Sequence, residues 1–328
     1  MKRRAFSVCV MGLILLLAGC GRKEPVTQPA EPAQPAQTET AAPTDAASEE
    51  ASRPPKGNKP ELVIAMPHDI TGLNPMTASA SMNDNWLVLT HETLFLRKED
   101  GSISPFIATE GVWTDDTTYE LMLRQDVTFS DGSRMTADDV VHTIKTAQGV
   151  HTEATDALLN GIEEVEAVTA DRVRFHTTAR IDDIERRLSD IALSVQSKAA
   201  YETGMQNPYL IGTGRYVFAD RVNGRYTTFK LNDLYWGTSP GVSKRISFYA
   251  IPEEETRVSA LLGGTVDIAL LKGAEGEDLT ARFADVTDVR LYEQASSEYR
   301  IAYRTEAVIP AFYENIPMPW GESYVVLE

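Results

Sequence analysis

The sequence predicts a mixed α/β fold, and three stretches carry this prediction. An apolar run at residues 62–66 leads into PHDITGLNP, where proline and glycine require a loop, so the run is typical of a buried strand. An alternating apolar pattern at residues 119–129 precedes a helical pattern that starts at residue 137. The stretch RISFYAI, a helical pattern and then VDIALL form a strand–helix–strand unit. Such units favour layers of helix packed on sheet.

Residues 119–129 are expected to form a strand or hairpin with one buried face, because Tyr119, Leu121 and Leu123 alternate with polar or flexible neighbours. A second helix is expected at residues 181–193, where apolar residues share one helical face. Strands are expected at residues 226–232 and 245–251. The helix that follows is predicted from Val258, Leu261 and Leu262 and ends at Gly263 and Gly264.

The stretch FSDGSRMTADDVV holds Asp131, Asp138 and Asp139, which raises the question of a metal or catalytic site. Its spacing lacks the alternate oxygen ligands and the distant glutamate of an EF-hand loop. Asp131 and Gly132 have turn chemistry, and Thr136 with Asp139 has the spacing of a helix capping box. The following helix has one apolar face, made of Ala137, Val140, Val141 and Ile144. We therefore interpret the three aspartates as residues that shape the backbone.

The first twenty residues have the features of a processing signal. Basic residues at positions 2–4 precede an apolar run at residues 8–17 that is short for a membrane span. The run ends in Leu-Ala-Gly-Cys, which resembles the lipobox of a bacterial lipoprotein. We expect residues 1–19 to be a signal peptide and Cys20 to become a lipidated N-terminus, and the alternative is an uncleaved membrane anchor. Both interpretations predict that the rest of the chain is extracytoplasmic.

Residues 20–59 are predicted to be the lipidated cysteine and a disordered tether. Residues 21–59 contain seven prolines among Ala, Thr, Gln and Glu, with no aromatic residue, so they cannot bury enough apolar surface to fold. The formal net charge of the whole chain is −17. This charge makes nucleic acid and anionic membrane surfaces poor partners.

Four further blocks come in a fixed order: LNPMTASASMNDNWLVLTHETLF, ATEGVWTDDTTYELMLRQDVTFSDGSRMTADDVVHTI, NPYLIGTGRYVF and KLNDLYWGTSPGVSKRISFYAIPEEETRVSALLGGTVDIAL. In this order they resemble the extracellular solute-binding proteins of family 5, the dipeptide-, oligopeptide- and nickel-binding components of ABC importers. The resemblance covers residues 62 to about 305. It implies an α/β, periplasmic-binding-protein-like fold of type II, a Venus flytrap that closes on a ligand and delivers it to a permease.

The resemblance also implies a domain organisation. Residues 60–305 would form the first lobe, with a base subdomain at about 60–97 and 205–305 and an inserted α/β subdomain at about 98–204. Only 23 residues follow residue 305, so the second lobe is expected to be largely absent. Residues 306–328 are either a return segment of the first lobe or an unrelated or frame-altered tail. Arg215 stands where relatives commonly have proline in a Gly-Thr-Gly-Pro-Tyr block.

The function implied is that of a lipid-anchored solute-binding protein for short peptides, which binds without chemistry or cofactor and serves an ABC permease and ATPase complex. In relatives the loop after the opening strand borders the cleft, so Asp69, Ile70 and Thr71 are candidates for backbone-type ligand contacts. Asn83 and Asp84, at the expected start of the next helix, are further candidates. The alternative for these residues is a plain surface loop and helix cap. The alternative function is a degenerate single-lobe scaffold or sensor-partner lipoprotein.

An enzyme is the competing class, and the residue inventory argues against it. The five histidines show no H-E-x-x-H motif or Cys/His metal spacing, and no G-x-S-x-G elbow is present. His142 is expected to face solvent. Trp113, Tyr235 and Trp236 are interpreted as core residues rather than cofactor contacts. The sequence thus predicts neither a catalytic nor a metal site.

Overall fold

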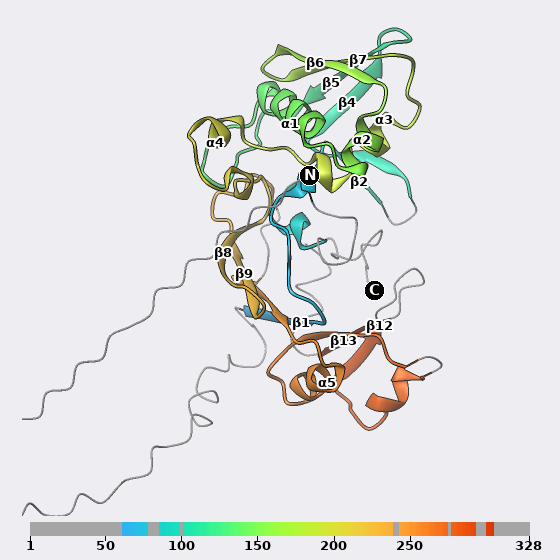
Figure 1. Cartoon of the computed structure of the whole chain (residues 1–328), viewed down its shortest axis with the longest axis vertical. Coiled ribbons are helices and arrows are strands. Elements are labelled where there is room, and N and C mark those ends of the chain that lie inside the picture. Colours follow the sequence, from blue (N-terminus) through green and yellow to red (C-terminus); the bar gives the residue numbers. More distant parts are fainter. Residues whose placement is uncertain are drawn as a thin grey trace, which may run out of the picture. The chain divides into compact units, whose positions relative to one another are not determined.

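The computed structural model describes residues 61–77, 85–98, 101–238, 243–274, 277–292 and 300–304. In these ranges the chain forms a seven-stranded sheet, a four-stranded sheet and a two-stranded ribbon (Figure 1). The seven-stranded sheet contains β1 (Glu61–Met66), β8 (Tyr216–Val222), β9 (Tyr226–Leu231), β10 (Arg245–Ala250), β11 (Ile268–Leu271), β12 (Val289–Tyr292) and β13 (Arg300–Arg304). Its strand order is β12-β13-β11-β1-β10-β9-β8.

Strand β1 lies in the centre of this sheet and is parallel to both of its neighbours, β10 and β11. The other strand pairs of the sheet are antiparallel. Leu62, Ile64 and Met66 face one core, and Ala65 faces another. Burial on both faces explains why the β1 sequence is almost continuously apolar.

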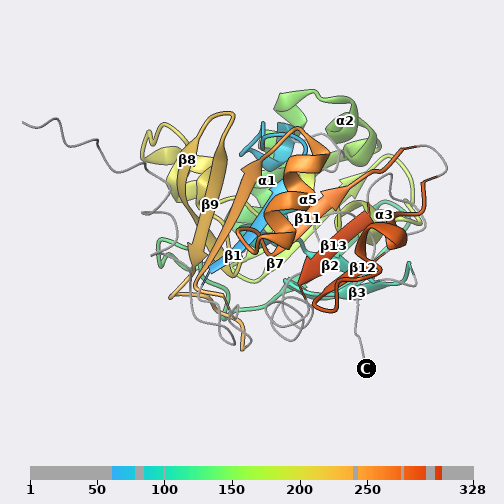
Figure 2. The ribbon, with the colours of Figure 1, turned by 90° about the horizontal axis from the view of Figure 1, so that it is seen from below.

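The two faces of the seven-stranded sheet are covered by different segments. On the face of Ile64 lies the 3-10 helix η4 (Asn85–Leu89), where Trp86 stacks on Phe229 with ring centroids 5.0 Å apart. On the face of Ala65 lies α5 (Glu254–Leu262), which packs along β11 (Figure 2). Strand β10, α5 and β11 form the strand–helix–strand unit expected from the sequence.

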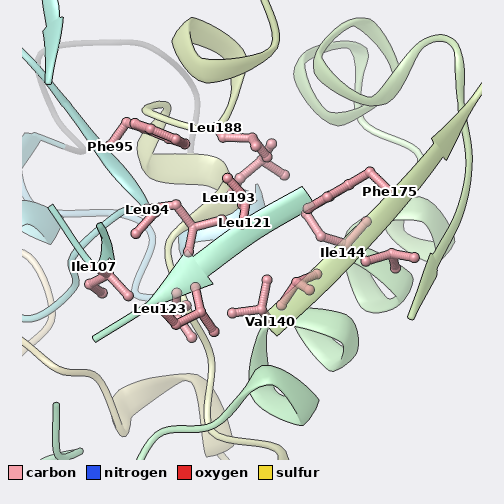
Figure 3. Close-up of a cluster of buried hydrophobic side chains, with 14 of the residues drawn as sticks. Leu94, Phe95, Ile107, Leu121, Leu123, Val140, Ile144, Phe175, Leu188 and Leu193 are labelled. Atoms are coloured by element: carbon pink, nitrogen blue, oxygen red, sulfur yellow. The ribbon is translucent and has the colours of Figure 1, made fainter. Parts of the chain in front are cut away.

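The four-stranded sheet is antiparallel, in the order β4-β5-β7-β6. It contains β4 (Ala108–Trp113), β5 (Thr118–Leu123), β6 (Ile162–Thr169) and β7 (Arg172–Thr177). Helix α1 (Ala137–Val150) packs on one face, where Val140 and Ile144 meet Leu121, Leu123 and Phe175 (Figure 3). Of the strand or hairpin predicted at residues 119–129, the part at 119–123 is confirmed, because Tyr119, Leu121 and Leu123 are buried while their neighbours are half-exposed. Strand β5 ends at Leu123, so the expectation of a strand up to residue 129 is wrong, although Val127 and Phe129 are buried.

The remaining elements are short. They are η3 (Pro75–Thr77), β2 (Phe95–Arg97), β3 (Ile103–Pro105), α2 (Glu153–Leu159), α3 (Ile184–Arg187), η5 (Ile191–Leu193), α4 (Lys198–Glu202), η6 (Pro208–Leu210) and η7 (Leu279–Phe283). Among the described residues, none of the helices has both the length and the apolar character of a membrane span.

The expectation of one helix over residues 181–193 is wrong. The α-helix ends after Arg187, and Asp190 adopts extended dihedral angles and accepts a hydrogen bond of 3.0 Å from the backbone N–H of Ala192. Asp190 thereby starts the separate helix η5, since an aspartate at this position caps a new turn better than it continues an old one. The apolar pattern nevertheless marked the buried side, because Ile184 and Leu188 lie in the core.

The structure answers the question raised by the three aspartates. The Asp131 carboxylate accepts hydrogen bonds from the backbone N–H and the hydroxyl of Ser133, and Gly132 next to it has a φ of 84°. The Asp139 carboxylate accepts from the backbone N–H of Thr136 at 2.8 Å, and from that of Lys198 at 2.9 Å. Asp138 lies in the first turn of α1. Their role in shaping the backbone is confirmed.

Candidate functional site

The connections that leave the carboxyl ends of β1 and β10 run to opposite faces of the seven-stranded sheet. After β1 the chain enters a loop at residues 67–74 and then η3, and η4 further along the chain packs on the face of Ile64. After β10 the chain enters α5, on the face of Ala65. The backbone N–H of Ile251 donates to the Met66 carbonyl over 2.8 Å, so the two strand ends stay side by side. In open α/β sheets, ligands bind outside the carboxyl ends of strands where the connections diverge in this way.

The first candidate residue, Asp69, lies in the loop that starts at this point. Its Oδ2 atom accepts hydrogen bonds from the backbone N–H of Gly224 at 2.7 Å and from Nη2 of Arg221 at 3.3 Å. Gly224 has a φ of 73° at the tip of the β8–β9 hairpin. The carboxylate of Asp69 therefore joins the loop to the hairpin.

The next two candidate residues differ in exposure. The Ile70 side chain is 1% exposed and belongs to the core on the η4 face, while its carbonyl accepts from Nη2 of Arg221. Thr71 is exposed. The structure thus fixes the loop from inside through Asp69 and Ile70 and leaves Thr71 on the surface.

Asn83, Asp84 and the lipidation candidate Cys20 lie outside the described residues. The predicted tail at residues 306–328 also lies outside them. The described chain resumes at Asn85, which begins η4.

Two residues that were not predicted from the sequence, Arg257 and Glu254, hold the strand ends together. Arg257 is 2% exposed and donates to the carbonyls of Leu270 and Ile251, both at 2.7 Å. Glu254, at the start of α5, accepts from the backbone N–H of Lys272 at 2.7 Å. The first turn of α5 thereby fixes the segments that follow β10 and β11. The available signal was that Arg257 shares a helix face with Leu261, four residues on.

Two of the other sequence predictions concern histidine and tryptophan. His142 was expected to face solvent, and this is wrong, because it is half-buried and packs edge-on against Tyr201 with ring centroids 4.6 Å apart. Burial lowers the pKa of His142. Trp113 and Trp236 pack against the core of the four-stranded sheet, as expected. Within the described ranges, no three His, Cys, Asp or Glu side chains are grouped so that they could hold a metal ion.

Comparison with protein families decides the identity of the chain. Residues 102–308 match the family described as bacterial extracellular solute-binding proteins, family 5 Middle. The chain belongs to this family. It is 28% identical over 239 residues to the nickel-binding periplasmic protein of Escherichia coli K12, covering 68% of this chain and 44% of that protein. It is 25% identical over 231 residues to the periplasmic murein peptide-binding protein MppA of the same organism, covering 64% and 43%.

Solved structures of family 5 relatives have the same fold. The unliganded open form of MppA matches with a TM-score of 0.63 at 23% identity, over 73% of this chain and 50% of that chain. NikZ from Campylobacter jejuni, in complex with Ni(L-His), also matches with a TM-score of 0.63 at 23% identity, over 71% and 47%. The predicted type II periplasmic-binding-protein fold is thus confirmed. The chain spans about half the length of the relatives it matches.

Proposed function

We propose that this chain is the first lobe of a lipid-anchored, extracytoplasmic solute-binding protein for short peptides, which binds without chemistry and serves an ABC permease and ATPase complex. Membership of family 5 supports the transport role. The observation that carries the site is the loop at residues 67–74, which leaves the carboxyl end of β1 where the connections of β1 and β10 diverge.

The loop is suited to main-chain recognition. The Asp69 carboxylate and the Ile70 side chain are used inside the fold, so the loop offers backbone groups and the Thr71 hydroxyl to a ligand. A peptide carries a regular series of N–H donors and carbonyl acceptors that pair with backbone groups of this kind. The similarity to MppA, a murein peptide-binding protein by name, supports a peptide ligand. Asn83 and Asp84 complete the proposed contact set.

Two subdomains are part of the proposal. The strands of the seven-stranded sheet lie at residues 61–66 and 216–304, and those of the four-stranded sheet lie at residues 108–177. This arrangement supports a base subdomain at about 60–97 and 205–305 and an inserted subdomain at about 98–204. The proposed ligand loop after β1 belongs to the base subdomain.

Calorimetric titration of the full chain tests the peptide site. A pooled library of di- to pentapeptides is expected to give heat of binding and Ni²⁺ alone is not. Thr71→Ala is expected to weaken peptide binding by about two- to twelvefold, equivalent to the loss of one hydrogen bond of about 0.5–1.5 kcal/mol. Thr178→Ala, at an exposed threonine after β7, is the matched control and should bind like the wild type. Binding of Ni²⁺ in place of peptide would refute the peptide class, and no binding of either would favour a scaffold without transport function.

A further inference from the structure

The chain passes from the core of the seven-stranded sheet to that of the four-stranded sheet at residues 90–94. It passes back toward the seven-stranded sheet before β8, and Gly214 in this second segment lies against the first. Trp86 and Leu89 belong to the core of the seven-stranded sheet, and Leu94 belongs to that of the four-stranded sheet. The backbone N–H of Gly214 donates to the Thr90 carbonyl at 3.0 Å. Residues 90–94 and the segment at Gly214 are therefore held together, and we call this contact the junction of the two sheets.

His91 adds a second bond to this junction. It is buried, and burial lowers its pKa to about 4, so the ring is neutral near pH 7. Its Nε2 atom lies 2.8 Å from the Tyr209 carbonyl. Because a carbonyl only accepts, Nε2 carries the hydrogen and donates.

Glu92 is the buried carboxyl group of this junction. Its side chain is 6% exposed, and its two oxygens accept hydrogen bonds of 2.8 Å each, Oε1 from the Tyr235 hydroxyl and Oε2 from Nε1 of Trp236. Trp236 packs against Phe106, with ring centroids 5.8 Å apart. Glu92 thereby ties the segment after β9 to the four-stranded sheet. We call Glu92, Tyr235 and Trp236 the Glu92 cluster.

Two arginines face this cluster from other segments. The Arg215 guanidinium lies 5.3 Å from the ring centroid of Tyr235, and that of Arg124 lies 4.7 Å from the ring of Trp236. Arg124 also pairs with Asp126 over 2.7 Å. Burial raises the pKa of Glu92 to about 7, although the hydrogen bonds from Tyr235 and Trp236, the charge of Arg215 and the nearby Thr213 hydroxyl oppose this rise.

The hydrogen-bond partners of Glu92 respond differently to a proton. An indole N–H can only donate, whereas a tyrosine hydroxyl can donate or accept. Ionised Glu92 accepts from both partners. Protonated Glu92 can keep the bond from Trp236 at its carbonyl oxygen and donate its own O–H to Tyr235. Burial also raises the pKa of Tyr235 above its usual range, so the tyrosine stays protonated throughout.

We propose that Glu92 is a reversible proton-binding switch at the junction of the two sheets, in which the bond to Tyr235 reverses while the bond from Trp236 persists. A proton entering the site binds one carboxylate oxygen, and the same proton leaves as the pH rises. The junction stays closed in both states, but the anchor of the segment after β9 changes from an ion to a neutral acid. This inference is independent of the ligand that the chain binds.

The test follows the indole of Trp236 in the full chain. With tryptophan labelled in ¹⁵N, the Nε1–H resonance of Trp236 is assigned by its absence in Trp236→Phe and is recorded from about pH 5 to about pH 9. In the wild type it is expected to shift in one step with a midpoint near 7. In Glu92→Gln the shift should vanish, because the amide imitates the protonated acid permanently.

The matched control uses a second tyrosine–carboxylate pair. The Tyr119 hydroxyl donates to Glu185 over 2.8 Å, so Glu185→Gln removes a similar pair and should leave the Trp236 titration unchanged. Arg215→Gln should move the midpoint to higher pH, because it removes a cation that favours the ion. A Trp236 resonance that is flat in the wild type, or that titrates equally in Glu92→Gln, would overturn the proposal. If Glu92→Gln does not fold, the wild-type and Arg215→Gln titrations decide it.

Discussion

Asp69 accepts a hydrogen bond of 2.7 Å from the backbone N–H of Gly224, a residue 155 positions further along the chain. This bond connects the loop after β1 to the tip of the β8–β9 hairpin. The shape of the proposed ligand loop therefore depends on a hairpin that is distant in sequence. The same carboxylate faces Arg221, whose Nη2 also holds the Ile70 carbonyl.

Asp69→Ala is expected to destabilise the fold by about 1–2 kcal/mol, because a partly exposed carboxylate loses two charge-assisted hydrogen bonds. Denaturant unfolding of the full chain measures this change. Asp182→Ala is the control, since Asp182 faces Arg180 at 3.5 Å with 94% of its side chain exposed. A surface pair of that kind should change stability by less than about 0.5 kcal/mol. Equal effects of both substitutions would contradict the role assigned to Asp69.

Asp139→Ala is expected to cost about 2–3 kcal/mol, more than Thr136→Ala, for which about 0.5–2 kcal/mol is expected. The reason is that Asp139 is buried and holds the N–H groups of both Thr136 and Lys198, which begin separate segments. Thermal or denaturant unfolding compares the two variants. Peptide titration should remain unchanged in both. Lost ligand binding with an unchanged unfolding curve would contradict the structural role.

Gly212→Ala is expected to destabilise the chain by more than about 2 kcal/mol, because a Cβ atom there would lie 2.0 Å from the carbonyl oxygen of Thr90. Gly149→Ala provides the opposite case. Gly149 lies in α1 with open space around the added methyl, so alanine should stabilise by about 0.5–1 kcal/mol. Chemical unfolding of both variants checks the signs. A neutral Gly212→Ala would show that the junction of the two sheets is not packed as described.

Glu92 is expected to make the wild type less stable as the pH rises from about 5 to about 8. Folding raises the pKa of Glu92 from 4.5 to about 7, so the folded state binds the proton more tightly than the unfolded state does. The resulting stabilisation of the fold is complete below pH 4.5 and is lost as the pH rises through about 7. The loss is up to about 3 kcal/mol. Glu92→Gln carries no such proton, so its stability relative to the wild type should increase with pH. Denaturant unfolding of both proteins at about pH 5 and about pH 8 measures the difference in their free energies of unfolding. A difference that is the same at both pH values would contradict the proton binding assigned to Glu92.

Cys20→Ala is expected to abolish lipid attachment, because Leu-Ala-Gly-Cys follows the apolar run at residues 8–17. Metabolic labelling with a fatty acid should mark the wild-type chain and not the variant. Cys9→Ala is the matched control and should be labelled like the wild type. Equal labelling of wild type and Cys20→Ala would rule out this anchor.

Features that depend on a few neighbouring residues could be predicted from the sequence. The alternation of Tyr119, Leu121 and Leu123 predicted a strand with one buried face, and the Asp131–Gly132 pair predicted a turn. The spacing of Thr136 and Asp139 predicted the helix start, because a capping residue acts within three positions. At residues 181–193 the same reasoning found the buried side but not the break, because the cap at Asp190 competes with the helical pattern.

Contacts between polar groups that are far apart in the chain depend on how the strands are arranged in the fold. Glu92 meets Tyr235 and Trp236, and Asp69 meets Gly224, at sequence separations of 143, 144 and 155. Local periodicity cannot predict these pairs, because a hydrogen bond needs its two atoms within about 3 Å and that position depends on strand order and register. In this strand order β1 lies between β10 and β11, which come much later in the chain. Glu92 and Asp69 can be read from the sequence, but their hydrogen bonds depend on partners that come close to them only in the folded chain.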